Sequence, residues 1–413
     1  MSGSVPFAGH LRGSAGYRRM IVALFAAGVA TFSQLYSVQG VLPALSRAQG
    51  VSEARAALAV SAATLGLAVS VIGWSVVADR IGRLRAMQTA VGAAVVLGLL
   101  VPAAPGFEAL LGLRFLEGAA LGGIPATALA YLSEEIHAMH SAIAAGTYIS
   151  GTTLGGLAGR LIAGPLSELA SWRIGTLVVS LLAAVAAAAF ILLAPAPRGF
   201  TPVPRRTPGQ PGLASKLWTN LANIRLLALY AQGLLLMGGF VAVYNFLGFR
   251  LEAPPFLVPA SLASLVFIAY LSGTWSSRQA GQLANRFGRL PALLGSIGVM
   301  AAGLAVTLAP TLVLVLLGLV LFTAGFFSAH AVASGWVPLI GRTGRAQSAS
   351  LYNLAYYTGS SLFGWAVGLA FIPYGWGGAV VFVLVLQGLA AGLAALFLRA
   401  SGARPARTAA AHG

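Results

Sequence analysis

The sequence predicts an all-α integral membrane protein with twelve transmembrane helices in two pseudo-symmetric six-helix bundles. Hydrophobic residues make up 58% of the 413 positions and charged residues only 8%, whereas a soluble domain has roughly 25% charged residues. A helix needs about 20 apolar residues to cross a hydrocarbon core, so this length accommodates about a dozen spans. The third observation is an internal duplication, because short patterns return after 206 or 208 positions.

The duplication extends over loops and spans of both halves. The charged run at 79–83 returns at 285–289, an offset of 206. Agreement at nearly one offset over several elements predicts a parallel repeat of two six-helix units. The pairs that match at an offset of 208 are Tyr36 and Tyr244, Gly40 and Gly248, Gly151 and Gly359, and Gly156 and Gly364.

Apolar runs divide the chain into spans and connecting segments. In the first half we expect spans at 20–43, 57–78, 86–104, 107–131, 143–164 and 174–194. In the second half we expect them at 224–249, 260–281, 290–309, 311–339, 347–370 and 377–398. Six prolines and several basic residues mark a surface linker between the halves. The predicted organisation is an N-terminal tail (1–19), an N-terminal bundle (20–194), a linker (195–223), a C-terminal bundle (224–398) and a basic tail (399–413).

The distribution of basic residues predicts the orientation in the membrane. Of the 25 Lys and Arg residues, 19 fall in segments assigned to one side, four to the other, and two, Arg114 and Arg160, within spans. The positive-inside rule then places both termini in the cytoplasm. The net charge of +17 needs no nucleic-acid partner, because the basic residues are scattered among loops and not gathered on one soluble face. With no Cys, the chain has neither disulfides nor thiolate metal sites.

The run at 79–83 resembles the loop signature of the major facilitator superfamily, the twelve-helix secondary transporters, where it follows the second helix. The resemblance implies a latch between the halves on the cytoplasmic side, in which Asp79 binds the amino-terminal end of the eleventh span near Ala346. Asn285 replaces the acid in the second copy, so a latch there is expected to be weaker. The alternative is a solvated loop that only sets topology. The candidate gate residues are Asp79, Arg80, Gly82, Arg83, Arg286, Gly288 and Arg289.

The fourth span carries a candidate for proton coupling. Arg114 and Glu117 share one helix face, in a pattern (111–118) that resembles a second signature of the superfamily. Glu117 is the one carboxylate predicted well inside a span, and a proton carrier needs a carboxylate whose pKa changes between two environments. A structural ion pair that never titrates is the alternative. His330, in the tenth span, has no second ligand at metal spacing, so we expect a titrating or hydrogen-bonding role and no metal.

The fifth span contains Gly151, Gly155 and Gly159 in a run that we expect Pro165 to end. The run resembles, imperfectly, the glycine-rich signature associated with antiporters, since Arg160 stands where the usual residue is apolar. Close packing of helix backbones is the alternative.

Polar and aromatic residues gather in the first, seventh, tenth and eleventh spans. Buried polar side chains in membranes usually face a bundle interior or a water-filled cavity, and carriers place their site near the midplane between their halves. The candidate cavity residues are Gln34, Tyr36, Gln39, Tyr244, Asn245, Asn353 and Tyr356.

Over residues 20–398 the chain resembles the arabinose-efflux-permease (YnfM-type) subgroup of proton-driven drug and sugar efflux carriers, above all at 114–135, 325–336 and 347–359. The resemblance implies a monomeric, proton-coupled antiporter of the bacterial inner membrane that exports a small organic solute, driven by the proton gradient without a cofactor. An importer or uniporter of the same fold is the alternative. A membrane enzyme would need a catalytic set, and the sequence has no His-Glu-x-x-His. A non-transporting receptor would bind a ligand without moving it.

Overall fold

A computed structural model describes residues 7–200, 212–342 and 344–399, and the regular elements of these ranges are helices. The N-terminal bundle consists of α1 (Ala15–Tyr36), η1 (Ser37–Val41), α2 (Leu42–Gln49), α3 (Glu53–Ile81), α4 (Arg83–Leu100), η2 (Val101–Ala103), α5 (Phe107–Leu121), α6 (Gly123–Glu135), α7 (Ala138–Leu169) and α8 (Trp172–Leu193). The C-terminal bundle consists of α10 (Ile224–Glu252), α11 (Ala260–Ala263), η3 (Ser264–Ala269), α12 (Tyr270–Phe287), α13 (Arg289–Val306), α14 (Leu312–Ile340), α15 (Arg345–Ala366) and α16 (Gly368–Phe397).

These elements form the twelve predicted spans, with boundaries displaced by a few residues. Four spans are composite: α1, η1 and α2 form the first, α4 and η2 the third, α5 and α6 the fourth, and α11, η3 and α12 the eighth. The last span is interrupted at Gly375, whose φ of 59° and ψ of −150° are not helical. The predicted start of that span, near residue 377, therefore coincides with the break.

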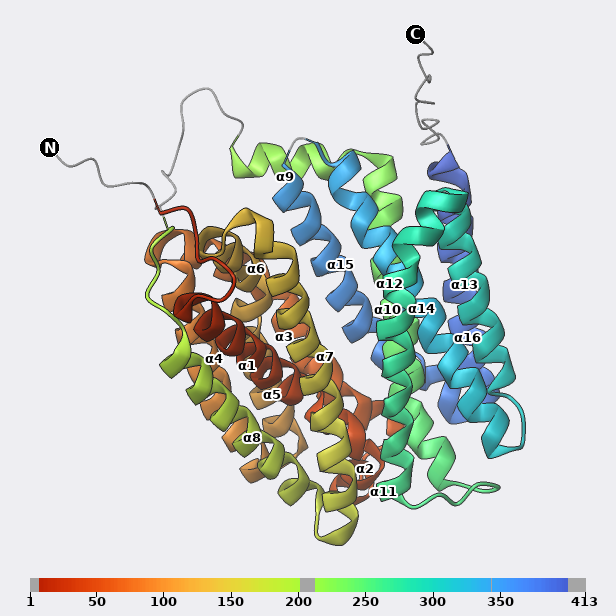
Figure 1. Cartoon of the computed structure of the whole chain (residues 1–413). Coiled ribbons are helices and arrows are strands. Elements are labelled where there is room, and N and C mark those ends of the chain that lie inside the picture. The colour runs from red at the N-terminus through yellow and green to blue at the C-terminus, as the bar shows by residue number, and fades with distance from the viewer. Residues whose placement is uncertain (1–6, 201–211, 343, 400–413) are drawn as a thin grey trace, which may run out of the picture.

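The two bundles stand side by side and diverge toward one end (Figure 1). At this end, here called the α9 end, lie the start of α1, the end of α16 and α9 (Leu213–Leu221). α2 and α11 lie at the opposite end, here called the α2 end, where the bundles approach each other. The linker thus contains a helix that the sequence interpretation did not include, while its residues 201–211 lie outside the described ranges.

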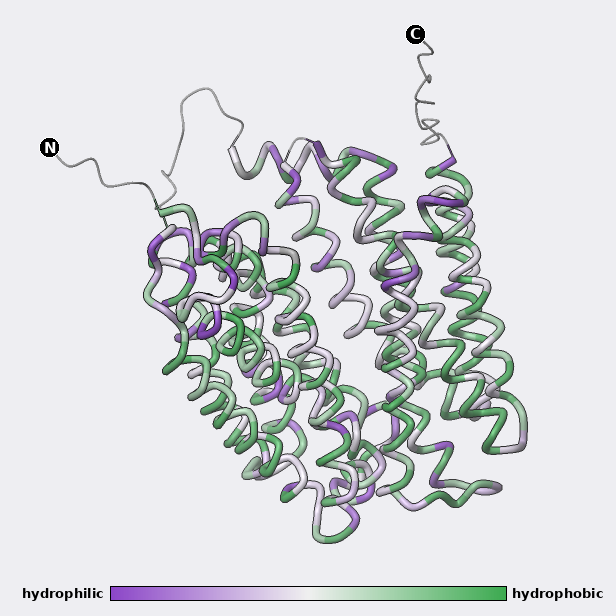
Figure 2. Tube along the Cα trace, in the orientation of Figure 1, coloured by the Kyte–Doolittle hydropathy of each residue, from purple (hydrophilic) through white to green (hydrophobic). Residues whose placement is uncertain are grey.

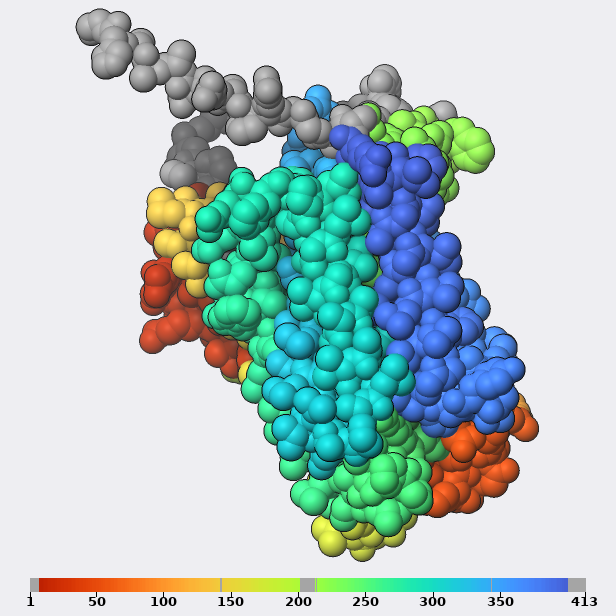
Figure 3. Space-filling model, turned by 90° about the vertical axis from the view of Figure 1, so that its right-hand side faces the viewer, coloured from red at the N-terminus to blue at the C-terminus, as the bar shows by residue number. Residues whose placement is uncertain are grey.

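Nine helical segments of the described chain are long and apolar enough to cross a membrane. They expose large hydrophobic side chains such as Val185 and Leu396. Figure 2 shows mostly hydrophobic residues along the peripheral helices and more hydrophilic residues toward the two ends of the molecule. The C-terminal bundle faces the viewer in Figure 3, with its helices packed along the long axis of the molecule. α7, α12 and α15 are not among the nine segments, and these more polar helices lie where the bundles meet.

The two copies of the charged loop have the same backbone conformation. Gly82 ends α3 with φ 95° and ψ 148°, and Gly288 ends α12 with φ 91° and ψ 157°. A side chain is strained at such positive φ values, so glycine is required at both positions. The repeat seen in the sequence is therefore also a repeat of local geometry.

Glycines of α7 pack against the backbone of α1, as the packing alternative predicts. A Cβ at Gly155 would lie 2.6 Å from the Cα of Val29, and Gly151 and Gly159 contact the α1 backbone one turn away on either side. Such small residues let membrane helices approach closely. The prediction that Pro165 ends the span was wrong: α7 continues to Leu169, because a proline near the end of a helix removes only its own hydrogen bond to the preceding turn.

We predict that Gly155→Ala destabilises the N-terminal bundle, by about 1–3 kcal/mol, because the added methyl group forces the α1 and α7 backbones apart. The measurement is the unfolding temperature of the purified protein in detergent. Gly146→Ala is the matched control in the same helix, since a Cβ there meets no atom within 4 Å. Equal unfolding temperatures for both variants would contradict the close helix contact.

Candidate functional site

A cavity of about 370 Å³ lies between the two bundles. Along α7 its wall runs from Arg160 to Ile149, and along α12 from Tyr270 to Ser277. Both directions lead toward the α9 end, where the bundles diverge (Figure 1). The lining residues are Phe32, Tyr36, Ile149, Thr152, Thr153, Gly156, Arg160, Met237, Phe240, Tyr270, Thr274, Ser277, Phe326, Phe327, His330, Ala331, Ser334, Tyr356 and Tyr357.

The bundles are joined at the floor of this cavity and beyond it, toward the α2 end. In the described ranges every hydrogen bond between the bundles lies in this half of the molecule. The cavity is therefore closed on the α2 side by side-chain contacts. The pairs, each with its donor first, are Gln39–Asn245 (2.6 Å), Arg47–Glu252 (2.7 Å), Arg160–Tyr270 (3.3 Å), Ser261–Glu168 (2.7 Å) and Ser361–Ser61 (2.8 Å).

Arg160 occupies the cavity floor. Its side chain is buried, and the residue is 2% exposed. Nε donates to Gln39 Oε1 at 2.7 Å, Nη1 to the Gly156 carbonyl at 2.7 Å, and Nη2 to the Tyr270 hydroxyl at 3.3 Å. Its guanidinium carbon lies 4.3 Å from the ring centre of Tyr36 and 4.8 Å from that of Tyr270. Neutral oxygens and aromatic faces thus stabilise the cation.

A chain of hydrogen bonds connects Arg160 to the C-terminal bundle. Gln39 accepts from Arg160 and donates through Nε2 to Asn245 Oδ1. Asn245 Nδ2 then donates to the Gly364 carbonyl at 2.9 Å. Gln39 lies in η1, where the first span changes from an α-helix to a 3₁₀ helix, and this change of winding presents its amide to both neighbours. Of the candidate cavity residues, Gln39 and Asn245 therefore lie directly behind the floor, where Gln39 contacts Arg160, and do not line the cavity.

Aromatic side chains and one histidine form the C-terminal wall. Phe240 and Phe326 stack with ring centres 3.9 Å apart. His330 Nδ1 lies 2.9 Å from the Tyr352 hydroxyl, and its ring centre lies 4.7 Å from that of Tyr356. Tyr36, Tyr356 and His330 are the candidate site residues that line the cavity itself. The wall is thus largely apolar, with few polar groups.

The other candidate cavity residues lie elsewhere. Gln34 is buried inside the N-terminal bundle, and both polar atoms of its side chain have no hydrogen-bond partner in the described structure. Tyr244 is buried among aromatic rings, and its hydroxyl lies 2.7 Å from Thr323 Oγ1. Asn353 is exposed and does not line the cavity. A polar residue in a span therefore does not by itself mark the cavity, because Gln34 and Tyr244 lie inside a bundle and Asn353 is exposed.

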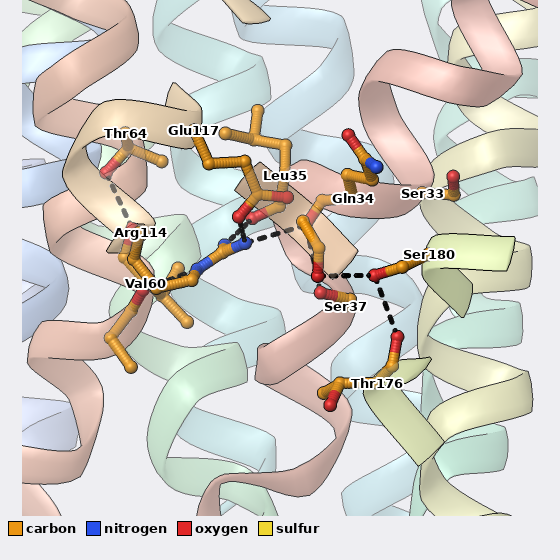
Figure 4. Close-up of polar contacts among 12 residues, drawn as sticks. Ser33, Gln34, Leu35, Ser37, Val60, Thr64, Arg114, Glu117, Thr176 and Ser180 are labelled. Atoms are coloured by element: carbon orange, nitrogen blue, oxygen red, sulfur yellow. Dashed lines mark hydrogen bonds and ion pairs between the residues drawn. The ribbon is translucent and has the colours of Figure 1, made fainter. Parts of the chain in front are cut away.

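Arg114 and Glu117 form an ion pair inside the N-terminal bundle (Figure 4). Arg114 is 0% and Glu117 1% exposed, and Nη1 lies 2.5 Å from Glu117 Oε2. The guanidinium also donates to three backbone carbonyls, those of Gln34 (3.1 Å), Leu35 (2.6 Å) and Ala59 (3.1 Å). Gln34 and Leu35 lie in the last turn of α1, just before η1. Arg114 therefore holds the turn of chain that carries Gln39, although neither member of the pair lines the cavity.

The candidate gate residues lie at the α9 end. Asp79 and Arg83 form an ion pair across the start of α4, and Arg83 Nε also donates to Glu134 Oε1 at 3.1 Å. In the second copy Arg289 donates to the Gly335 carbonyl at 3.2 Å, and Arg286 packs on Phe287. These contacts stay within one bundle. In this conformation, with the α9 ends apart, Asp79 is bonded within its own bundle.

Most residues that line the cavity were not identified from the sequence as cavity residues, and the two that matter most for its chemistry are Arg160 and Tyr270. Arg160 was noted only as a departure from the antiporter pattern, yet a charged residue inside a span with no acid at helical spacing signals a functional position. Tyr270 was not singled out, because aromatic residues in spans are common and its role depends on its contact with Arg160.

Two repeated six-helix bundles around a central cavity define a secondary transporter, and three comparisons agree. The family described as Major Facilitator Superfamily matches residues 20–281. The inner membrane transport protein YnfM of Escherichia coli (strain K12) is 39% identical over 375 residues, 91% of this chain and 89% of that protein. The MFS-type transporter YybF of Bacillus subtilis (strain 168) is 36% identical over 369 residues, 89% of this chain and 91% of that protein.

Solved structures show the same fold. A bacterial homologue of the human lysosomal transporter Spinster, in an inward-facing and occupied conformation, has a TM-score of 0.74 at 18% identity, with 94% of this chain and 98% of that chain covered. The nucleoside transporter NupG has a TM-score of 0.69 at 16% identity, with coverages of 92% and 99%. The chain belongs to the major facilitator superfamily. It is a multi-pass membrane transporter for a small molecule, and not an enzyme.

Proposed function

We propose that this chain is a proton-coupled antiporter that exports a small organic solute from the cytoplasm of a bacterial cell by alternating access. The observation that carries the proposal is the position of the cavity, which lies between the bundles, with the inter-bundle hydrogen bonds of the described ranges all on its α2 side. The transporter works as a monomer, because the two halves already enclose the pathway.

The positive-inside rule assigns the α9 end to the cytoplasm. In that orientation the cavity faces the cytoplasm, which is the loading position of an exporter. An importer of the same fold releases its solute from the same conformation. Direction therefore depends on how protons are coupled to the solute, and coupling needs a group that changes charge.

Glu117 is the proposed proton-coupling group, with Arg114 as its partner. Three backbone carbonyls hold Arg114 independently of Glu117, so protonation of the carboxylate leaves the arginine in place. Gln34 Nε2 and Glu117 Oε1 converge at Gly98, where a Cβ would lie 2.7 and 2.9 Å from them. A change in the charge of Glu117 therefore acts on the segment that leads through η1 to Gln39 and the cavity floor. His330 is a second titratable candidate on the cavity wall.

The proton antiport test uses the wild type and Glu117→Gln in proteoliposomes with an imposed proton gradient. Luminal pH is followed while a pentose, a lipophilic cation or an aromatic carboxylate is added. We expect one class of solute to trigger proton movement in the wild type. In the variant we expect a response slower by about 10²–10⁴-fold, the contribution of a positioned proton-transfer group. Solute movement with no proton response in either protein would show a uniporter.

Asp79 is proposed to close the cytoplasmic side by binding the amino-terminal end of α15 when the α9 ends meet. We expect Asp79→Asn to fold normally and to slow transport about two- to fivefold, since a charge at a helix terminus contributes about 0.3–1 kcal/mol. Transport rates in proteoliposomes check this, with Arg85→Gln as a control at an exposed position of the same loop region. A wild-type rate for Asp79→Asn would exclude the latch.

A further inference from the structure

We propose that the solute carried in this cavity is an organic anion, a carboxylate attached to an apolar or aromatic body, and that Arg160 binds its negative charge. The inference rests on the proposed transport function and names the solute class of that same site. It follows from the charges around the cavity, the contacts of Arg160 and the composition of the cavity wall.

No carboxylate neutralises Arg160. The sequence has eight acidic residues, and all of them lie in the described ranges. Five are in ion pairs with other arginines, Glu135 and Glu168 accept backbone N–H groups, and Glu53 lies in the first turn of α3. None of them lines the cavity. The five paired acids are Asp79, Glu108, Glu117, Glu134 and Glu252.

Arg160 therefore differs from Arg114, the other arginine buried in a span. Glu117 balances the charge of Arg114 inside its bundle, whereas Arg160 has only neutral acceptors and aromatic faces. A buried charge without a counter-ion is costly and in membrane proteins marks a functional position. Three of its five N–H groups are used in these bonds, which leaves one on each terminal nitrogen for a carboxylate.

The rest of the cavity fits the body of such a solute. Phe240, Phe326 and Phe327 supply an apolar wall, and Tyr356 and His330 add polar groups on the same side. The volume of about 370 Å³ is in the range of sites for small molecules. A cationic solute would meet a like charge at the floor and no acid anywhere on the wall. The surplus of basic residues over the whole chain also attracts anions.

The test compares three probes that share one ring: benzoate, benzyl alcohol and benzylamine, with 4-hydroxybenzoate and phenylacetate as further carboxylates. Binding to the purified full chain in detergent is measured by the shift in its unfolding temperature as a function of probe concentration. We expect carboxylates to bind the wild type at least tenfold more tightly than the alcohol or the amine. We expect this preference to disappear in Arg160→Gln and to persist in Arg85→Gln, which changes an exposed arginine.

Two further variants apply if Arg160→Gln does not fold. Arg160→Lys keeps the charge but loses the bidentate donor of the guanidinium, so we expect it to weaken carboxylate binding several-fold. Tyr270→Phe keeps the aromatic ring and loses only the hydroxyl next to Arg160 Nη2, so we expect it to preserve carboxylate binding. The anion proposal is overturned if no carboxylate binds, if the alcohol or amine binds the wild type as tightly, or if Arg160→Lys binds carboxylates like the wild type.

The binding and transport assays test the anion site and proton antiport independently. Tight carboxylate binding without proton movement in proteoliposomes would leave the anion site standing and refute proton antiport. Proton movement triggered by the alcohol or the amine, but not by any carboxylate, would support antiport and refute the anion site.

Discussion

Arg114→Gln is expected to lower the stability of the N-terminal bundle by about 3–5 kcal/mol, the effect of removing one partner of a buried ion pair. The change leaves Glu117 inside the bundle without its cation, and it deprives three backbone carbonyls of their donor. A buried group without its partner carries its full desolvation penalty. The expected result is a large loss of monodisperse protein after extraction, and a markedly lower unfolding temperature of what remains.

Glu117→Gln is the matched comparison. Its amide oxygen can still accept from Arg114, and the three carbonyl bonds of Arg114 are unaffected, so we expect a smaller loss of stability and a folded protein. This makes Glu117→Gln suitable for the proton assay. If Arg114→Gln unfolded at the temperature of the wild type, the pair would not hold the bundle together.

Gln39→Ala is expected to shift the protein toward a conformation that is open at the α2 end. The change removes the 2.6 Å bond to Asn245, which crosses between the bundles, and the 2.7 Å bond from Arg160. Leaving such buried groups unpaired costs about 1–3 kcal/mol, which corresponds to about a 5- to 150-fold change in the ratio of the two conformations. The shift is measured as the labelling rate of Ser264→Cys by a membrane-impermeant maleimide, because Ser264 is buried in η3 against Gly164 of the other bundle and becomes accessible only when the α2 end opens.

Gln39→Glu is the opposing variant. A carboxylate at this position lies against Arg160 and supplies the acid that the cavity floor lacks, so we expect slower labelling at the α2 end and a loss of carboxylate binding. The chain has no Cys, so the maleimide labels only the introduced cysteine. Equal labelling of Ser264→Cys with Gln, Ala and Glu at position 39 would show that this bond does not control closure.

The fold could be predicted because its signals are local. Apolar runs of sufficient length determine the spans, and the requirement for positive φ at Gly82 and Gly288 marks the repeated turn in both halves. The prediction that a helix ends at Pro165 was wrong, because a proline in the last turns of a helix removes few of its hydrogen bonds. The helix in the linker was not predicted because the segment around it is dominated by proline and charge.

The site was harder to predict because it depends on how the helices are rotated and on which of them meet. Polarity within a span does not distinguish the core of one bundle, where Gln34 lies, from the space between bundles, where Tyr36 lies two residues later. Arg160 could have been noticed by its lack of an acid at helical spacing. Its partners, Gln39 and Tyr270, come from distant segments, and only the assembled fold brings them together.

Alternating access by the two bundles is tested most directly by measuring two distances between spin labels on introduced cysteines in proteoliposomes. One pair, Met139→Cys with Phe287→Cys, spans the α9 end, and the other, Leu169→Cys with Leu262→Cys, spans the α2 end; all four residues are exposed. We predict that solute and a proton gradient shorten the first distance and lengthen the second, in step. Both distances unchanged during ongoing transport would contradict alternating access by rocking of the two bundles.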